Sequence, residues 1–122
     1  MTISYRFLAE RNMLVATAAG PVSPADNERS NHYVKTELDR HPGLKLLVDM
    51  RAAQVAATPV AMIAMVDAFF ALVGHRVPTA IVTAGLPDDP NAMIVETKAF
   101  IANARIKIFD SVDDATAWLE RQ

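Results

Sequence analysis

Residues 44–73 read LKLLVDMRAAQVAATPVAMIAMVDAFFALV, and this stretch decides the fold class. It opens with a nearly continuous apolar run, Leu44 to Asp49, as expected of an interior β-strand that is covered on both faces. Thr58-Pro59 then marks a helix start, because a threonine side chain caps free backbone N–H groups and proline loses nothing at the first helical position. A strand followed by a helix predicts an α/β architecture.

The same kind of helix start recurs along the chain. Ser23-Pro24 and Asp89-Pro90 repeat the pairing of a capping residue with proline, and Ser111 stands three residues before Asp114, as in a capping box. We therefore expect helices that begin near residues 24, 59, 90 and 112.

Short β-prone runs precede the last three of these helices, at residues 44–49, 77–83 and 105–109. Near the N-terminus, alternation over residues 3–7, a polar turn at 10–12 and a second run at 13–18 predict an antiparallel hairpin. The predicted order is β-β-α-β-α-β-α-β-α, a mixed five-stranded sheet with parallel later strands. We expect residues 1–122 to form one domain.

Composition limits the function classes. Apolar residues make up 52 % of the chain, and charged residues, which are interspersed and sum to a net charge of -2, make up 21 %, as in soluble globular proteins that do not bind nucleic acid. The absence of cysteine removes disulfides and thiolate chemistry and fits a cytoplasmic protein. The N-terminus does not read as a signal peptide, and the apolar stretch at 59–73 is too short to be transmembrane.

No catalytic signature stands out. The glycines form neither a dinucleotide fingerprint nor a phosphate loop, and His32, His41 and His75 lack the spacing of metal ligands on one helix. The acidic pairs Asp88-Asp89 and Asp113-Asp114 fall in predicted first helical turns, where negative charge stabilises a helix. We expect no catalytic residue, no metal and no cofactor.

The predicted helix at 59–73 is apolar on every side, whereas a surface helix normally keeps a polar face. Its large side chains are expected to form a core face, and they are Met62, Ile63, Met65, Val66, Phe69, Phe70, Leu72 and Val73. The opposite face is built of small residues and one acid, and it contains Ala61, Ala64, Ala68, Ala71 and Asp67, with Val60. This small-residue face calls for a second protein surface or an apolar ligand.

A second candidate site follows the central strand. Asp49 and Arg51 stand where the predicted strand ends, and open α/β sheets place their ligand crevice at that rim. The alternative is that the two side chains pair with one another locally.

Several motifs together resemble the SpoIIAA-like branch of the STAS superfamily. They are the strand end Leu47-Val48-Asp49-Met50, the helix start Thr58-Pro59 and the closing segment Ile108-Phe109-Asp110-Ser111-Val112-Asp113-Asp114-Ala115-Thr116-Ala117-Trp118-Leu119. The resemblance implies a non-enzymatic module. Anti-sigma-factor antagonists of this superfamily carry a phosphorylatable serine about nine residues beyond the strand-end aspartate, and Thr58 holds that place here. Ala57 and Pro59, however, depart from the family pattern around it.

Three hypotheses follow from these patterns. In the first, the protein is a regulatory or interaction module, a homodimer or a partner of a regulatory protein, that uses the alanine face. In the second, it binds a small apolar or lipid-like ligand beside the same helix. The contacts would come from six residues, which are Asp49, Arg51, Met62, Met65, Phe69 and Phe70. The third is an enzyme that uses Asp49 and Arg51.

Overall fold

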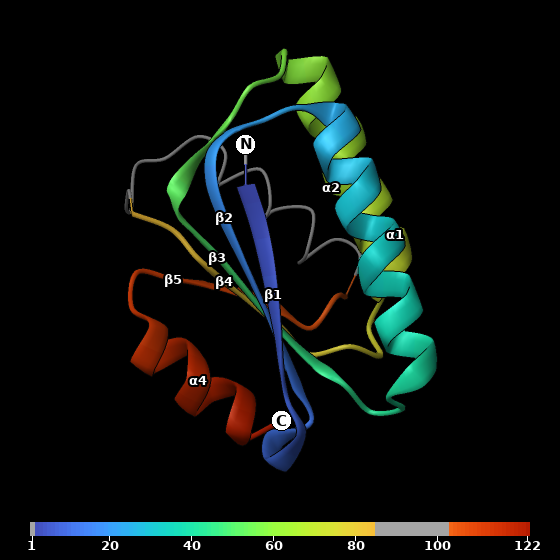
Figure 1. Ribbon diagram of the computed structural model, residues 1–122, viewed down its shortest axis with the longest axis vertical. Helices are drawn as coiled ribbons and strands as arrows, with labels where there is room; N and C mark the ends of the chain where they lie inside the picture. Colours follow the sequence, from blue (N-terminus) through green and yellow to red (C-terminus); the bar gives the residue numbers. More distant parts are fainter. Residues whose placement is uncertain (1, 85–102) are drawn as a thin grey trace.

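The computed structural model describes residues 2–84 and 103–122 (Figure 1). Two strands come first, and the strands and helices that follow stand in the predicted order. In chain order they are β1 (Thr2–Leu8), a 3-10 turn (Ala9–Arg11), β2 (Met13–Val22), α1 (Pro24–Arg40), β3 (Lys45–Val55), α2 (Pro59–Val73), β4 (Thr79–Val82), β5 (Ile106–Phe109) and α4 (Val112–Glu120). The helix predicted near residue 90 and the acidic pair Asp88-Asp89 lie outside the described residues.

The strands form one mixed sheet in the order β1-β2-β3-β4-β5. β1 runs antiparallel to β2, with Phe7 opposite Leu14, whereas β2, β3, β4 and β5 are mutually parallel. The predicted fold class, an α/β fold with a mixed five-stranded sheet, is therefore confirmed. In the part of the chain that is described, no helix has the length and apolar character needed to cross a membrane.

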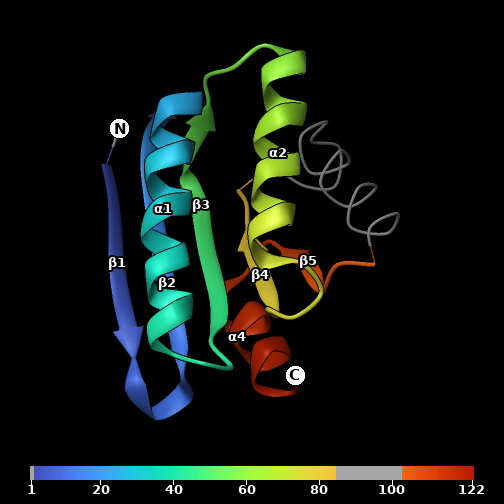
Figure 2. The same cartoon turned by 90° about the vertical axis from the view of Figure 1, so that its right-hand side faces the viewer.

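Helices cover both faces of this sheet. α1 and α2 lie side by side on one face, and α4 lies on the other (Figures 1 and 2). On β3, Leu46 belongs to the core cluster beneath α1 and α2, while Leu47 belongs to the cluster beneath α4. Successive strand side chains point to opposite faces. β3 is thus the interior strand, covered on both sides, that its apolar sequence predicts.

Three of the predicted helix starts are confirmed by their caps. The Ser23 hydroxyl accepts a 3.2 Å hydrogen bond from the backbone N–H of Asp26, whose carboxylate accepts one of 2.9 Å from the Ser23 N–H. The Thr58 hydroxyl accepts a 3.1 Å bond from the N–H of Ala61, and Ser111 caps α4 in the same way. Each cap satisfies a donor that the first helical turn leaves without a partner.

The prediction for the end of β3 is wrong. The apolar run predicts a strand that ends at Asp49, but β3 continues to Val55, which stands opposite Val22 of β2. Pairing with the ten-residue β2 supplies the backbone hydrogen bonds that hold this alanine-rich segment extended. Asp49 and Arg51 therefore lie inside a strand and not at its rim.

A β-bulge divides β3 into two parts. Between Thr17 and Ala19 of β2 the register shifts, so that β3 carries one extra residue. The extra residue changes which positions face α1 and α2. As a result Met50 and Ala53, three residues apart, pack against the same apolar cluster.

Candidate functional site

The large-residue face of α2 packs toward the sheet, as predicted, with one difference in detail. Met62, Met65, Val66 and Val73 are buried. Ile63, which the sequence assigns to the core face, is instead 41 % exposed. The buried positions of α2 recur at intervals of three, four and seven residues, so they form a stripe along one side of the helix. This stripe is narrower than the core face that the sequence predicts, and Ile63 lies outside it.

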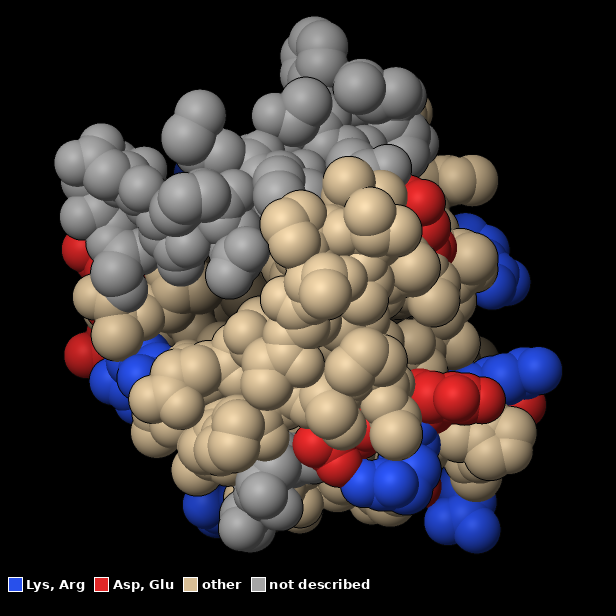
Figure 3. Space-filling model, turned by 90° about the horizontal axis from the view of Figure 1, so that it is seen from above, with Lys and Arg blue, Asp and Glu red and all other residues tan. Residues whose placement is uncertain are grey.

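The small-residue face of α2 is open in the structure. Ala64, Asp67, Ala68 and Ala71 are exposed, and Ala61 is half-buried. Val60, at the start of the helix, is 79 % exposed. Figure 3 looks onto the end of the molecule where α1 and α2 begin, and it shows a broad area without charged side chains, bordered by acidic and basic groups.

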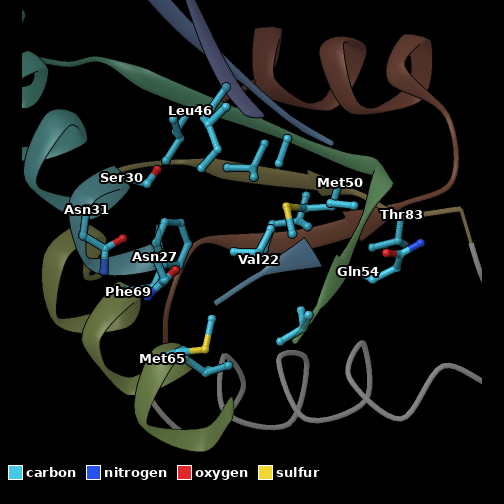
Figure 4. Close-up of a pocket in the computed structure, with 18 of the residues that line it drawn as sticks. Val22, Asn27, Ser30, Asn31, Leu46, Met50, Gln54, Met65, Phe69 and Thr83 are labelled. Carbon is cyan, nitrogen blue, oxygen red and sulfur yellow. The ribbon is translucent and has the colours of Figure 1, made fainter. Parts of the chain in front are cut away.

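A cavity of about 450 Å³ lies between the sheet and the layer formed by α1 and α2 (Figure 4). The strands contribute mainly aliphatic side chains to its walls, and α2 contributes methionine and phenylalanine. The structure brings five of the six predicted ligand contacts to this one cavity, and they are Arg51, Met62, Met65, Phe69 and Phe70. Asp49, the sixth, is not among the lining residues.

Asp49 takes part instead in a local ion pair. The Arg51 guanidinium donates hydrogen bonds of 3.0 and 2.9 Å to the two Asp49 carboxylate oxygens, and the Arg51 backbone N–H donates a third of 3.1 Å. The side-chain hydrogen bond from Arg51 lowers the pKa of Asp49 below its usual range, against the opposing effect of burial, and Asp49 raises the pKa of Arg51. The sequence offered two interpretations of Asp49 and Arg51, a ligand site at the strand end or a local ion pair, and the structure shows the local ion pair.

Polar side chains gather at two places on the cavity wall, and the sequence reasoning missed both. Asn27, Ser30 and Asn31 line the cavity from α1, while Gln54 and Thr83 line it from the ends of β3 and β4. Figure 4 shows the α1 group beside Phe69 and the other group across the cavity. The α1 spacing of three and four residues continues to Val34, so these side chains extend the inward face of the helix.

Ser30 is held in place by an aromatic pair. The Tyr5 hydroxyl of β1 donates a 2.9 Å hydrogen bond to Ser30 Oγ, and the Tyr5 ring stacks on Tyr33 of α1 with centroids 3.8 Å apart. β1 thereby fixes the N-terminal half of α1, and with it the neighbouring amides, relative to the sheet.

The family model described as SpoIIAA-like matches residues 13–120. The chain belongs to the SpoIIAA-like family. A comparison with curated proteins gives no match.

Solved structures show the same SpoIIAA-like fold at low sequence identity. A SpoIIAA-like protein of unknown role from Shewanella loihica has a TM-score of 0.68 at 17 % identity, covering 97 % of this chain and 92 % of that one. An anti-sigma factor antagonist from Mycobacterium paratuberculosis has a TM-score of 0.67 at 14 % identity, covering 99 % and 96 %. The anti-sigma factor antagonist SpoIIAA, in its unphosphorylated form, has 0.62 at 11 %, covering 98 % of both chains.

In this SpoIIAA-like chain Thr58 is exposed at the first turn of α2. Its hydroxyl oxygen already accepts the capping bond from Ala61. A phosphate there would lie against the positive end of the helix dipole, where negative charge is stabilised.

Of the three histidines, His41 has packed partners. His41 stacks on Phe7 with ring centroids 3.9 Å apart, and its Nε2 lies 3.4 Å from a carboxylate oxygen of buried Glu37. Among residues 2–84 and 103–122, no three histidine or acidic side chains come together in a way that could hold a metal ion.

Proposed function

We propose that this SpoIIAA-like domain is a binding module that takes a small apolar, lipid-like ligand in the cavity between the sheet and α1–α2. The observation that carries the proposal is the cavity itself, with a volume of about 450 Å³ and predominantly aliphatic, methionine and phenylalanine walls. Pockets for small molecules have volumes of about 300–1,000 Å³ and mostly apolar linings with a few polar groups. Water fills such a space poorly, because it finds few hydrogen-bond partners there.

The lining of α2 suits a ligand without a rigid shape. Met62 and Met65 are unbranched and polarisable, so they can adjust to different apolar groups. Phe69 and Phe70 supply large flat surfaces one helical turn further along. Together they account for the apolar character of α2 on the side that turns toward the sheet.

The ionisable groups around the cavity favour a binding function over a catalytic one. Arg51 is the one ionisable residue among the described lining residues, and its guanidinium is already engaged by Asp49. A general acid or base needs a titratable group within hydrogen-bond reach of the substrate. We therefore place the enzyme hypothesis behind the binding hypothesis.

Native mass spectrometry of freshly purified protein tests the proposal. We expect a fraction of the molecules to carry an added mass that organic extraction removes, and the extracted protein to take up one fatty alcohol per chain. Protein that is empty as purified and takes up no alcohol would contradict the proposal.

A second candidate function rests on the open face of α2. Val60 and Ile63 are exposed hydrophobic side chains, and they adjoin the exposed positions Ala64, Ala68 and Ala71. Small residues allow a second backbone to approach closely. We propose this face as the contact with a second copy of the chain or with a regulatory protein, a role that the anti-sigma factor antagonists among its structural neighbours make reasonable.

Thr58 adjoins that face, and we propose it as a phospho-acceptor on account of its exposure and its place at the first turn of α2. A dianion there would add negative charge beside a surface whose one ionisable residue is Asp67. Peptide mapping of the protein isolated from its own cells checks this. Unmodified Thr58 under every growth condition would contradict it.

A further inference from the structure

We propose that the cavity ligand is amphipathic with an uncharged polar end, a hydroxyl, ester or amide, and that Asn27 and Asn31 of α1 hydrogen-bond this end. The inference rests on the proposed ligand-binding function and narrows its ligand class. It starts from the polar groups on a wall that is otherwise almost entirely apolar.

The two α1 amides are available to a ligand. Both side chains are half-buried and line the cavity. Neither takes part in a hydrogen bond with any other described residue, while the neighbouring Ser30 hydroxyl already accepts a bond from Tyr5. No side-chain nitrogen or oxygen of the described residues is buried without a hydrogen-bond partner, so the amide atoms of Asn27 and Asn31 are accessible to a bound molecule or to water.

The charges of the lining argue against an ionised end group. A buried carboxylate or phosphate needs a cation, and the guanidinium of Arg51, the one cationic lining group among the described residues, is held by Asp49. A buried ammonium needs an anion, and the described lining residues include no Asp or Glu. A side-chain amide offers both a donor and an acceptor, which match a neutral hydroxyl, ester or amide.

The geometry also gives the ligand a direction. Asn27 and Asn31 lie at the same end of the cavity as Phe69, and Met50 and Val22 lie further along it (Figure 4). A polar end bound to α1 would direct the apolar chain between α2 and the sheet. The amides thus decide orientation, while the apolar walls supply most of the contact.

Titration with ligands of equal chain length tests this. We expect octanol to bind about tenfold tighter than octanoate or octylammonium, because only the alcohol enters without the cost of a buried charge. Cyclohexane, which has no polar end, serves as the probe of the cavity itself. Methionine methyl NMR signals report binding in each case.

A variant and its control test whether the two amides cause the preference for octanol. The double variant Asn27→Leu with Asn31→Leu should weaken octanol binding about threefold to tenfold for each hydrogen bond lost. It should not weaken cyclohexane binding, because cyclohexane makes no hydrogen bond and leucine only adds apolar surface to the wall. His32→Leu, on the exposed side of the same helix, should change neither. Asn31→Ala, a smaller change, takes the place of the double variant if the latter does not fold.

The outcomes separate the inference from the function on which it rests. If cyclohexane binds but octanol and octanoate bind equally, or if the amide variants bind octanol as the natural protein does, the uncharged end group is wrong and the cavity function stands. If none of the probes binds, the proposed function itself fails.

Discussion

Asp49 and Arg51 stand two residues apart on β3, and the Arg51 guanidinium reaches both carboxylate oxygens of Asp49, at 3.0 and 2.9 Å. Planar two-point contact of this kind is stronger than a single charged hydrogen bond. Among the described residues that line the cavity, Arg51 is the one cation, and this pair neutralises it. What the sequence suggests as a reactive rim is therefore a closed ion pair within a strand.

This pair predicts a pH dependence of stability. Its hydrogen bond lowers the pKa of Asp49 from the ordinary value of 3.8, so the stabilisation is complete above that value and is lost as the pH falls through the lowered pKa of the folded state. Because the Arg51 side chain is half exposed, we expect Arg51→Gln to lower the free energy of unfolding only slightly at neutral pH. Urea unfolding of both proteins over a pH series measures this. A difference that stays constant down to about pH 2 would contradict the assignment.

Thr58 predicts a capping effect that is separate from any phosphorylation. Thr58→Ala should lower the free energy of unfolding by about 1 kcal/mol, since the N–H of Ala61 loses its acceptor. Thr58→Ser keeps the hydroxyl and should stay close to the natural protein. Chemical denaturation measures both variants, and equal stability of the alanine and serine variants would show that the cap contributes nothing.

Adjacent alanines on β3 offer a matched test of the cavity. Ala53 lines the cavity, whereas Ala52 is exposed and is not among the lining residues. Ala53→Phe places a ring in the ligand space and should weaken octanol binding by about tenfold or more. Ala52→Phe adds the same ring outside and should leave the affinity unchanged. Equal affinities of the two variants, measured by calorimetry, would place the ligand elsewhere.

The open face of α2 predicts an effect on assembly. Ala64→Glu with Ala68→Glu puts two charges on exposed positions, so the monomer should stay folded while a dimer or complex through this face dissociates. Ala117→Glu, at an exposed position of α4, is the control and should leave assembly intact. Light scattering gives the mass directly. A natural protein and double variant of identical mass would remove the homodimer hypothesis.

Much of the fold could be predicted because its signals are local. Ser23, Thr58 and Ser111 each cap a helix within three residues of themselves, and the apolar run before Asp49 predicts a strand covered on both faces. The extension of β3 to Val55 could not be predicted in this way. It depends on pairing with β2, some thirty residues earlier in the chain, and alanine-rich sequence carries no strand signal of its own.

The candidate site was predictable on one wall only. Because α2 is apolar on every side, the sequence predicts Met62 and Phe69 as ligand contacts. Asn27 and Asn31, which also line the cavity, look in the sequence like ordinary polar residues of a surface helix. Their spacing relative to Val34 was a usable signal, since the three share one helical face. A polar pair on the same stripe as a buried valine indicates an inward face that is not filled by core packing.

The most direct test of the central claim is a methionine methyl NMR titration with octanol. Met50, Met62 and Met65 line the cavity, whereas Met13 is buried in the cluster beneath α4 on the opposite face of the sheet. We predict saturable shifts of the three cavity signals while the Met13 signal stays in place. Unchanged cavity signals, or shifts of equal size at Met13, would contradict a ligand site between the sheet and α1–α2.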